Sequence, residues 1–101
     1  MGVEIAFDAA KDAVNRAKHG VSLADADQLR WDWLYCRPDV LRDYRELREV
    51  GYAPLEDRVY CVVFVQQDVV FRIISLRRAN AREVHDHDQA LQEFRLHHPH
   101  A

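Results

Sequence analysis

Two short segments near the middle of the chain are apolar and rich in β-branched and aromatic residues. They cover residues 59–65 and 69–75, and three polar residues, 66–68, separate them. Segments of this length and composition, joined by a short polar connection, are typical of two antiparallel strands that form a hairpin. Residues 3–7 have the same character and predict a short first strand.

A helix is predicted over residues 9–19, immediately after the first strand. Asp8 is a suitable N-cap residue, and Gly20 stands where a left-handed C-cap residue is expected. Small apolar side chains recur at helical spacing, which predicts a buried helix face formed by Ala10, Ala13, Val14 and Ala17. Ser22, followed by Asp25 in a capping-box arrangement, predicts a second helix that ends at about residue 30.

The segments between this second helix and the hairpin are less regular. Residues 31–37 are aromatic and predict a strand that Pro38 would interrupt, and residues 42–50 fit a strand or, nearly as well, a helix. Gly51 and Pro54 predict a turn. A last helix is expected over residues 80–96, with Leu91 and Phe94 continuing a buried stripe after Val84.

This order of elements predicts one α+β domain over residues 1–96, followed by a frayed tail at 97–101. Strands that follow one another, with helices toward both ends of the chain, indicate an antiparallel sheet with two N-terminal helices and one C-terminal helix packed on it. A length of 101 residues fits a single domain with a thin core.

Composition restricts the function classes only partly. The net charge of −3 argues against nonspecific binding of nucleic acid through a broad basic field. The 14 basic residues include only two lysines, however, and the rest are arginines, whose planar donors match phosphate. A local phosphate site is therefore compatible with the composition.

Location and redox state follow from simpler features. The apolar runs are too short to cross a bilayer and the N-terminus lacks the pattern of a signal peptide, so we expect a cytoplasmic protein. Cys36 and Cys61 have no CxxC or His/Cys spacing, and we interpret them as reduced, buried thiols. We expect no metal and no cofactor, because His85 and His87 are two apart on a helix and the other C-terminal histidines lie in the tail.

Three sequence segments resemble motifs of the BrnT family of toxins. Residues 15–21 read NRAKHGV and are similar to N-x-x-K-H-G-V. Glu46, Leu47 and Arg48 are followed by Gly51, as in an E-x-R strand that ends at glycine. Residues 72–79 read RIISLRRA, with Glu83 after them, and are similar to R-I-I-S-A-R-x-A with its trailing glutamate.

The resemblance implies a RelE-like fold and a metal-independent endoribonuclease that inhibits translation and growth. It also implies a BrnA-like antitoxin partner, an RNA substrate, and contact with DNA only indirectly, through the antitoxin complex. The chain departs from the family pattern at Leu76, Arg78 and residues 31–43. His87 replaces the aromatic residue often found four positions after the trailing glutamate, so a role for a C-terminal tyrosine is not carried over.

The candidate site residues come from these motifs and from the chemistry of RNA cleavage, which requires a base, an acid and a cation near the phosphate. Arg72 occupies a strand face between Val70 and Ile74, where an apolar residue is the default, so it either faces a cleft or forms a structural ion pair. The candidate catalytic residues are Lys18, His19, Glu46, Arg48, Arg72 and Arg77, and the candidate RNA-binding residues are Arg45, Arg78 and Arg82.

Each assignment has a structural alternative. Glu46 and Arg48 could be an inert surface pair, Arg77 and Arg78 a solvated pair, and Lys18 and His19 could simply favour the C-terminal end of the helix dipole. Trp31, Trp33 and Tyr35 alternate along one strand and indicate a core or a partner interface more than a platform for bases. The alternative function is a weakened toxin homologue that only binds its antitoxin and acts as a co-repressor, and an unrelated structural α+β protein is a third possibility.

Overall fold

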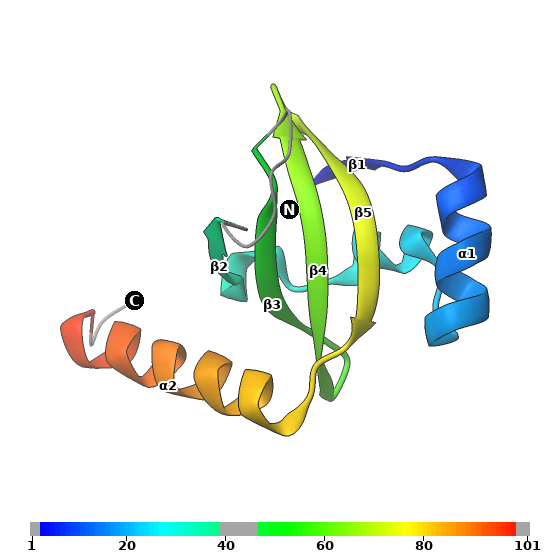
Figure 1. Ribbon diagram of the computed structural model, residues 1–101. Coiled ribbons are helices and arrows are strands. Elements are labelled where there is room, and N and C mark those ends of the chain that lie inside the picture. Colours follow the sequence, from blue (N-terminus) through cyan, green and yellow to red (C-terminus); the bar gives the residue numbers. More distant parts are fainter. Residues whose placement is uncertain (1–2, 39–46, 99–101) are drawn as a thin grey trace.

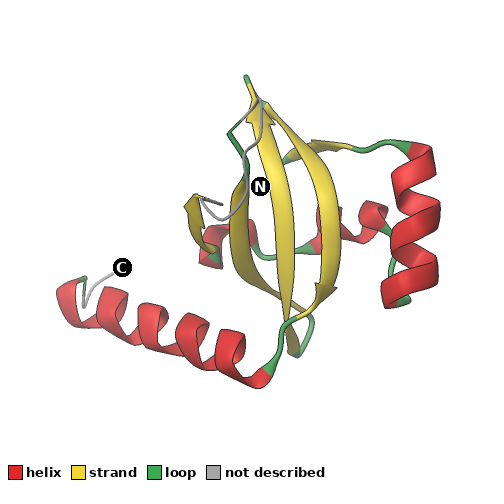
Figure 2. Cartoon of the chain, in the orientation of Figure 1, coloured by secondary structure: helices red, strands yellow, loops and turns green. Residues whose placement is uncertain are grey.

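The computed structural model describes residues 3–38 and 47–98. Within these ranges the chain forms one five-stranded sheet in the order β1-β5-β4-β3-β2 (Figures 1 and 2). The strands are β1 (Glu4–Ala6), β2 (Tyr35–Pro38), β3 (Glu49–Leu55), β4 (Arg58–Gln67) and β5 (Val70–Arg78). The helices are α1 (Ala9–His19) and α2 (Ala81–His97), with short 3-10 helices η1 (Leu23–Gln28) and η2 (Trp31–Trp33).

The sheet is mixed, which corrects the expectation of a purely antiparallel one. Strands β2 to β5 run antiparallel to their neighbours, whereas β1 pairs in parallel with β5. Strands joined by a tight turn have to be antiparallel. The direction of β1 is not constrained in this way, because α1 and the two 3-10 helices separate it from the other strands.

The hydrophobic core lies on one face of this sheet. Leu23, Ala26 and Leu29 pack from the 3-10 segment onto buried residues of β3, β4 and β5. An aromatic cluster extends the core, with the Trp31 ring 5.4 Å from the Phe64 ring and 5.0 Å from the Phe71 ring. The 3-10 helices pass behind the sheet in Figure 1, so the view is onto the opposite face.

Several predicted elements are confirmed. Helix α1 has the predicted bounds and ends at Gly20, whose φ of 75° is the left-handed conformation that glycine adopts without strain. The central hairpin is present with longer strands, and its turn contains Asp68 at a φ of 56°. Helix α2 begins after Asn80, which forms a capping box with Glu83.

The predicted second α-helix is wrong, because residues 23–28 form a 3-10 helix. Leu23, Ala26 and Leu29 are three residues apart, so a helix with three residues per turn places them on one side, and all three are buried. The capping acceptor also differs from the prediction. Asp12 Oδ1 accepts hydrogen bonds from Ser22 Oγ at 3.0 Å and from the Leu23 N–H at 2.7 Å.

The predicted turn at Gly51 and Pro54 is also wrong, because both residues lie within β3. A Cβ at Gly51 would lie 2.6 Å from Leu34 Cδ1, so the glycine allows close packing. The Pro54 carbonyl accepts from the Arg30 N–H outside the sheet. Since the nitrogen and carbonyl of a strand residue point to the same side, Pro54 removes no bond to β4. The actual turn follows Leu55, with Glu56 at a φ of 55°.

Three expectations about burial and strand extent need correction. Strand β2 starts only at Tyr35, because residues 31–33 form η2, and it includes Pro38. Cys36 is exposed, and only Cys61 is a buried thiol. The apolar face predicted for α1 is exposed, as is half of Phe94 on α2, while the buried residue of α1 is Asn15.

Candidate functional site

The face of the sheet opposite the core carries four arginines. The strand register defines three rows across it, because side chains at paired positions lie on the same side. The rows are Tyr35–Tyr52–Cys61–Arg77, then Arg37–Val50–Val63–Ser75, and finally Val65–Arg72. Arg48 immediately precedes Glu49, the first residue of β3, and alternation of side chains assigns it to the same side as Val50. We call this surface, with Arg37, Arg48, Arg72 and Arg77, the arginine face.

A β-bulge brings Arg72 and Arg77 onto the same face. Five positions separate them, so strict alternation would place them on opposite sides of the sheet. The pairing of β4 with β5 shifts at Val63 and Phe64, which leaves an extra residue in β5. As a result Ile73 and Leu76, three positions apart, are both buried in the core, and Arg77 rather than Arg78 shares the face of Arg72.

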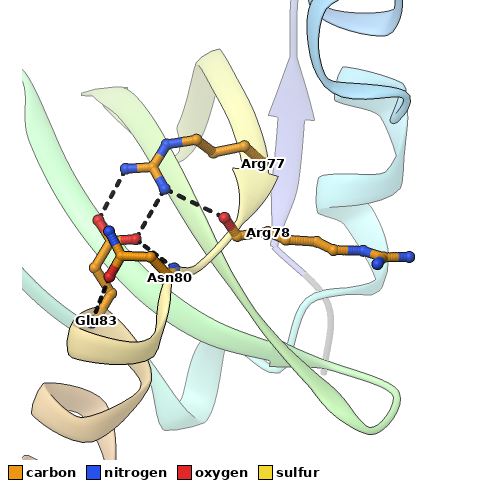
Figure 3. A network of polar contacts seen from close by, with 4 residues as sticks. All are labelled: Arg77, Arg78, Asn80 and Glu83. Atoms are coloured by element: carbon orange, nitrogen blue, oxygen red, sulfur yellow. Dashed lines mark hydrogen bonds and ion pairs between the residues drawn. The ribbon is translucent and has the colours of Figure 1, made fainter.

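Arg77 is held by Glu83 at the start of α2. Its Nη1 donates to Glu83 Oε1 and its Nη2 to Oε2, each at 2.8 Å, and Nη1 also donates to the Arg78 carbonyl at 3.2 Å (Figure 3). Glu83 Oε1 accepts from the Asn80 N–H as well, at 2.8 Å. The hydrogen bonds from Arg77 lower the pKa of the Glu83 carboxyl, and the same pairing raises the pKa of Arg77.

Arg37 completes this corner of the arginine face. Burial raises the pKa of the Cys61 thiol to about 11, and the positive charges of Arg77 and Arg37 oppose that rise. Arg37 also helps to lower the pKa of Glu83. Arg37, from β2, thus adds to the positive charge that acts on Cys61 and Glu83.

The end of α1 is fixed to the adjacent edge of β5 by Asn15. Its Nδ2 donates to the Leu76 carbonyl at 2.8 Å and to the Val21 carbonyl at 3.0 Å, and its Oδ1 accepts from the Leu76 N–H at 3.2 Å. The pairing of β1 with β5 ends at Arg72, so the amide of Asn15 satisfies backbone groups that a neighbouring strand would otherwise bind.

This attachment places the end of α1, with Lys18 and His19, beside the edge of β5. The pKa of His19 is lowered by partial burial first, and then by the charges of Lys18 and Arg77. A histidine near Arg77 with a lowered pKa is neutral at pH 7 and able to accept a proton. The structure thus brings Lys18 and His19 near the end of β5 that carries Arg77.

The remaining predicted residues are not gathered there. Arg78 ends β5 and points away from Arg77 (Figure 3), and Arg82 is exposed in the first turn of α2. Arg45 and Glu46 lie outside the described residues. Sequence reasoning placed Arg37 in the predicted strand 31–37 but not in the site, because its position on the arginine face depends on pairing between strands. It also missed the pairing of Glu83 with Arg77, although an N3 glutamate is a recognisable capping signal.

Metal sites and membrane-spanning helices are two further features that the described residues could contain. Within residues 3–38 and 47–98, no group of three or more histidine, cysteine or acidic residues is placed to hold a metal ion. The helices of these same ranges are too short or too polar to cross a membrane.

Comparison with known proteins identifies the family. A family model described as the ribonuclease toxin BrnT of type II toxin–antitoxin systems matches residues 7–83, about three quarters of the chain. The chain belongs to the BrnT family of ribonuclease toxins. Membership implies an RNA substrate and an antitoxin partner. A comparison with curated proteins finds no match. The BrnT match includes the arginine face and ends at Glu83, so nearly all of α2 lies beyond it.

Proposed function

We propose that this BrnT protein is a metal-independent endoribonuclease whose arginine face binds the RNA backbone. The observation that carries the proposal is that arginines from β2, from β5 and from the residue before β3 share one face of the sheet. Guanidinium groups bind phosphate oxygens in pairs, so such a face can hold an RNA strand locally although the net charge is −3.

The proposed reaction uses the RNA 2′-hydroxyl as the nucleophile. A base removes its proton, the 2′-oxygen attacks the adjacent phosphorus, and the bond to the 5′-oxygen breaks as an acid protonates that oxygen. The products are a 2′,3′-cyclic phosphate and a free 5′-hydroxyl. We assign charge stabilisation to Arg48 and Arg72, and proton transfer to His19 and Glu46 with Lys18 beside them.

Arg77 has a different part in this proposal. Both of its terminal nitrogens donate to Glu83, which neutralises its charge, so we assign it a structural role in this proposal. In the state described here it positions α2 and the end of β5. Arg45, Arg78 and Arg82 are assigned to more distant contacts with the RNA strand.

The cellular role follows from the family. We propose that cleavage inhibits translation and growth in the cytoplasm, and that a BrnA-like antitoxin neutralises the toxin and supplies the contact with DNA. We also propose a RelE-like classification of the fold, which is supported by an antiparallel β2–β5 unit with helices at both ends of the chain.

The neutralisation of Arg77 by Glu83 favours a second candidate function. A homologue that has lost efficient cleavage would keep this pair as a structural element and would act as a binding module and co-repressor with its antitoxin. The two functions differ in whether the chain, freed of antitoxin, degrades RNA.

The test is cleavage of total RNA by the purified chain in excess EDTA. We expect cleavage to persist, with 2′,3′-cyclic phosphate ends, and Arg72→Ala to lower the rate about 10²–10³-fold, as for loss of one electrostatic contact to the transition state. Arg58→Ala, at an exposed arginine outside the arginine face, is the matched control. Arg72→Lys and an unfolding curve for each variant separate loss of charge from loss of folding.

Two results would contradict the proposal. One is equal activity of Arg72→Ala and Arg58→Ala, which would remove the arginine face from the mechanism. The other is arrest of cleavage by EDTA, which would require a metal. An intact, folded wild-type chain with no cleavage at all would support the binding module instead.

A further inference from the structure

A groove of about 460 Å3 lies between α2 and the segment from η2 to β2. Its two walls come from parts of the chain more than fifty residues apart. One wall is Asp32, Trp33, Leu34 and Tyr35, and the other is His87, Ala90, Leu91, Phe94, Arg95 and His98. The His87 ring, which is buried, bonds through Nε2 to the Trp33 carbonyl at 2.9 Å and joins the walls at one end.

The α2 wall is an amphipathic stripe whose apolar part is open to solvent. Its members recur at three- and four-residue spacing along the helix, as expected for a face that contacts another element. Phe94 is nevertheless 50% exposed, and Trp33 and Tyr35 on the opposite wall are 36% and 40% exposed. Large aromatic side chains this open to solvent that line one groove are typical of an interaction site.

The groove lining contains one arginine, Arg95, and one carboxylate, Asp32, which pairs with Arg30 outside the lining. The Arg30 and Arg95 guanidinium groups lie 5.4 Å and 5.7 Å from the centre of the Trp33 ring. Asp32 neutralises Arg30 through a 3.0 Å ion pair, whereas Arg95 has no carboxylate partner within the described part of the chain. The acidic residues of α2 (Glu83, Asp86, Asp88 and Glu93) are not in the groove lining. An occupant with apolar and acidic side chains is therefore complementary.

One residue of the groove lining, Tyr35, also belongs to the arginine face. Tyr35 lines the groove, and its ring lies 6.2 Å from the ring of Tyr52. Tyr52 belongs to the row of paired residues that ends at Arg77. Tyr52 and Cys61 in this row are buried, so a chain segment in the groove would lie beside the arginine face at Tyr35.

We propose that this groove binds an amphipathic segment of the antitoxin. Its apolar side chains would contact Trp33, Leu91 and Phe94, and its carboxylates would pair with Arg95 and with the arginine face, which would exclude RNA. The aliphatic lining from Leu34, Ala90 and Leu91 favours an apolar protein segment over a phosphate-bearing strand. The inhibition step rests on the proposed function, whereas binding in the groove does not.

The test uses the full-length toxin and the antitoxin encoded beside its gene, purified separately, with the dissociation constant measured by calorimetry. Phe94→Ala is expected to raise the Kd roughly 10- to 100-fold, as for an interface anchor. Leu96→Ala is the matched control, because Leu96 is 79% exposed on the same helix but outside the groove. Arg95→Glu is expected to weaken binding while Arg58→Glu does not, and thermal unfolding checks that each variant folds.

Several outcomes would overturn the groove proposal. Equal affinities for Phe94→Ala and Leu96→Ala would do so, as would a change in self-association of the toxin caused by Phe94→Ala, since the occupant would then be a second copy. A loss of RNA binding by Phe94→Ala without loss of antitoxin binding would assign the groove to RNA. The affinities are measured without RNA, so absence of ribonuclease activity would refute the proposed function and not the groove.

Discussion

The Arg77–Glu83 pair allows a quantitative test of how α2 is attached to the sheet. In a Glu83→Gln variant the side-chain oxygen still accepts from the Asn80 N–H, but the amide nitrogen cannot accept from Arg77. Hydrogen bonds to charged groups contribute about 1.5–3 kcal/mol when buried. The Arg77 side chain is 35% exposed, so solvent screening reduces this, and we expect a loss of about 1–2 kcal/mol in the free energy of unfolding.

The pH dependence of this loss has a defined sign. The pKa of Glu83 in the folded chain is lowered below its ordinary value of 4.5, mainly by hydrogen bonds from Arg77. A lowered carboxyl pKa contributes stability above the ordinary pKa, and this stability is lost as the pH falls through the folded value. Urea unfolding from pH 7 to pH 3 should therefore show the wild type and Glu83→Gln converging as the pH falls.

The control is Glu93→Gln, an exposed acidic residue on the same helix, which should change stability by less than about 0.5 kcal/mol. An Arg77→Ala, Glu83→Gln double-mutant cycle isolates the coupling between the two side chains. A difference between wild type and Glu83→Gln that stayed constant over this pH range would refute the argument. A coupling energy near zero would show that the bidentate geometry does not stabilise the fold.

Two further predictions concern the α1 attachment and the thiols. Asn15→Ala should destabilise the fold by about 3–5 kcal/mol in urea unfolding, because it leaves the buried N–H and C=O groups of Leu76 without partners, whereas Arg16→Ala on the exposed side of α1 should change little. A loss of less than about 1 kcal/mol in the free energy of unfolding would mean that water forms the hydrogen bonds that the Asn15 amide made to Leu76. Ellman's reagent should label one thiol rapidly in the folded chain, Cys36, and label Cys61 only after unfolding; equal labelling would contradict the burial of Cys61.

Local sequence signals were sufficient to predict helices α1 and α2 and the central hairpin. Gly20 ends α1, Asn80 caps α2, and the β-branched segments form the central hairpin, whereas Asp8 stands at the N-cap of α1 without a side-chain capping bond. The 3-10 helix was missed because a serine cap was given more weight than the three-residue spacing of Leu23, Ala26 and Leu29. That spacing was visible in the sequence and favours three residues per turn.

The arginine face could be predicted only in part, because its assembly depends on pairing between distant strands. Arg72 was identified from its position on an apolar strand, but its relation to Arg77 depends on a bulge that no local pattern reveals. Asn15 was interpreted only as part of a motif, and its contact with β5, sixty-one residues away, required the structure. Such long-range contacts determine which charged side chains lie on the same surface, and local sequence patterns do not predict them.

The parts of the candidate site converge on the last residues of β5. Asn15 binds the backbone of Leu76, Glu83 binds the side chain of Arg77, and Arg77 donates to the carbonyl of Arg78. This explains why Leu76 can differ from the alanine of the resembled motif. Its side chain is buried in the core, while Asn15 contacts only its N–H and C=O, so a larger side chain changes the packing and leaves the attachment of α1 intact.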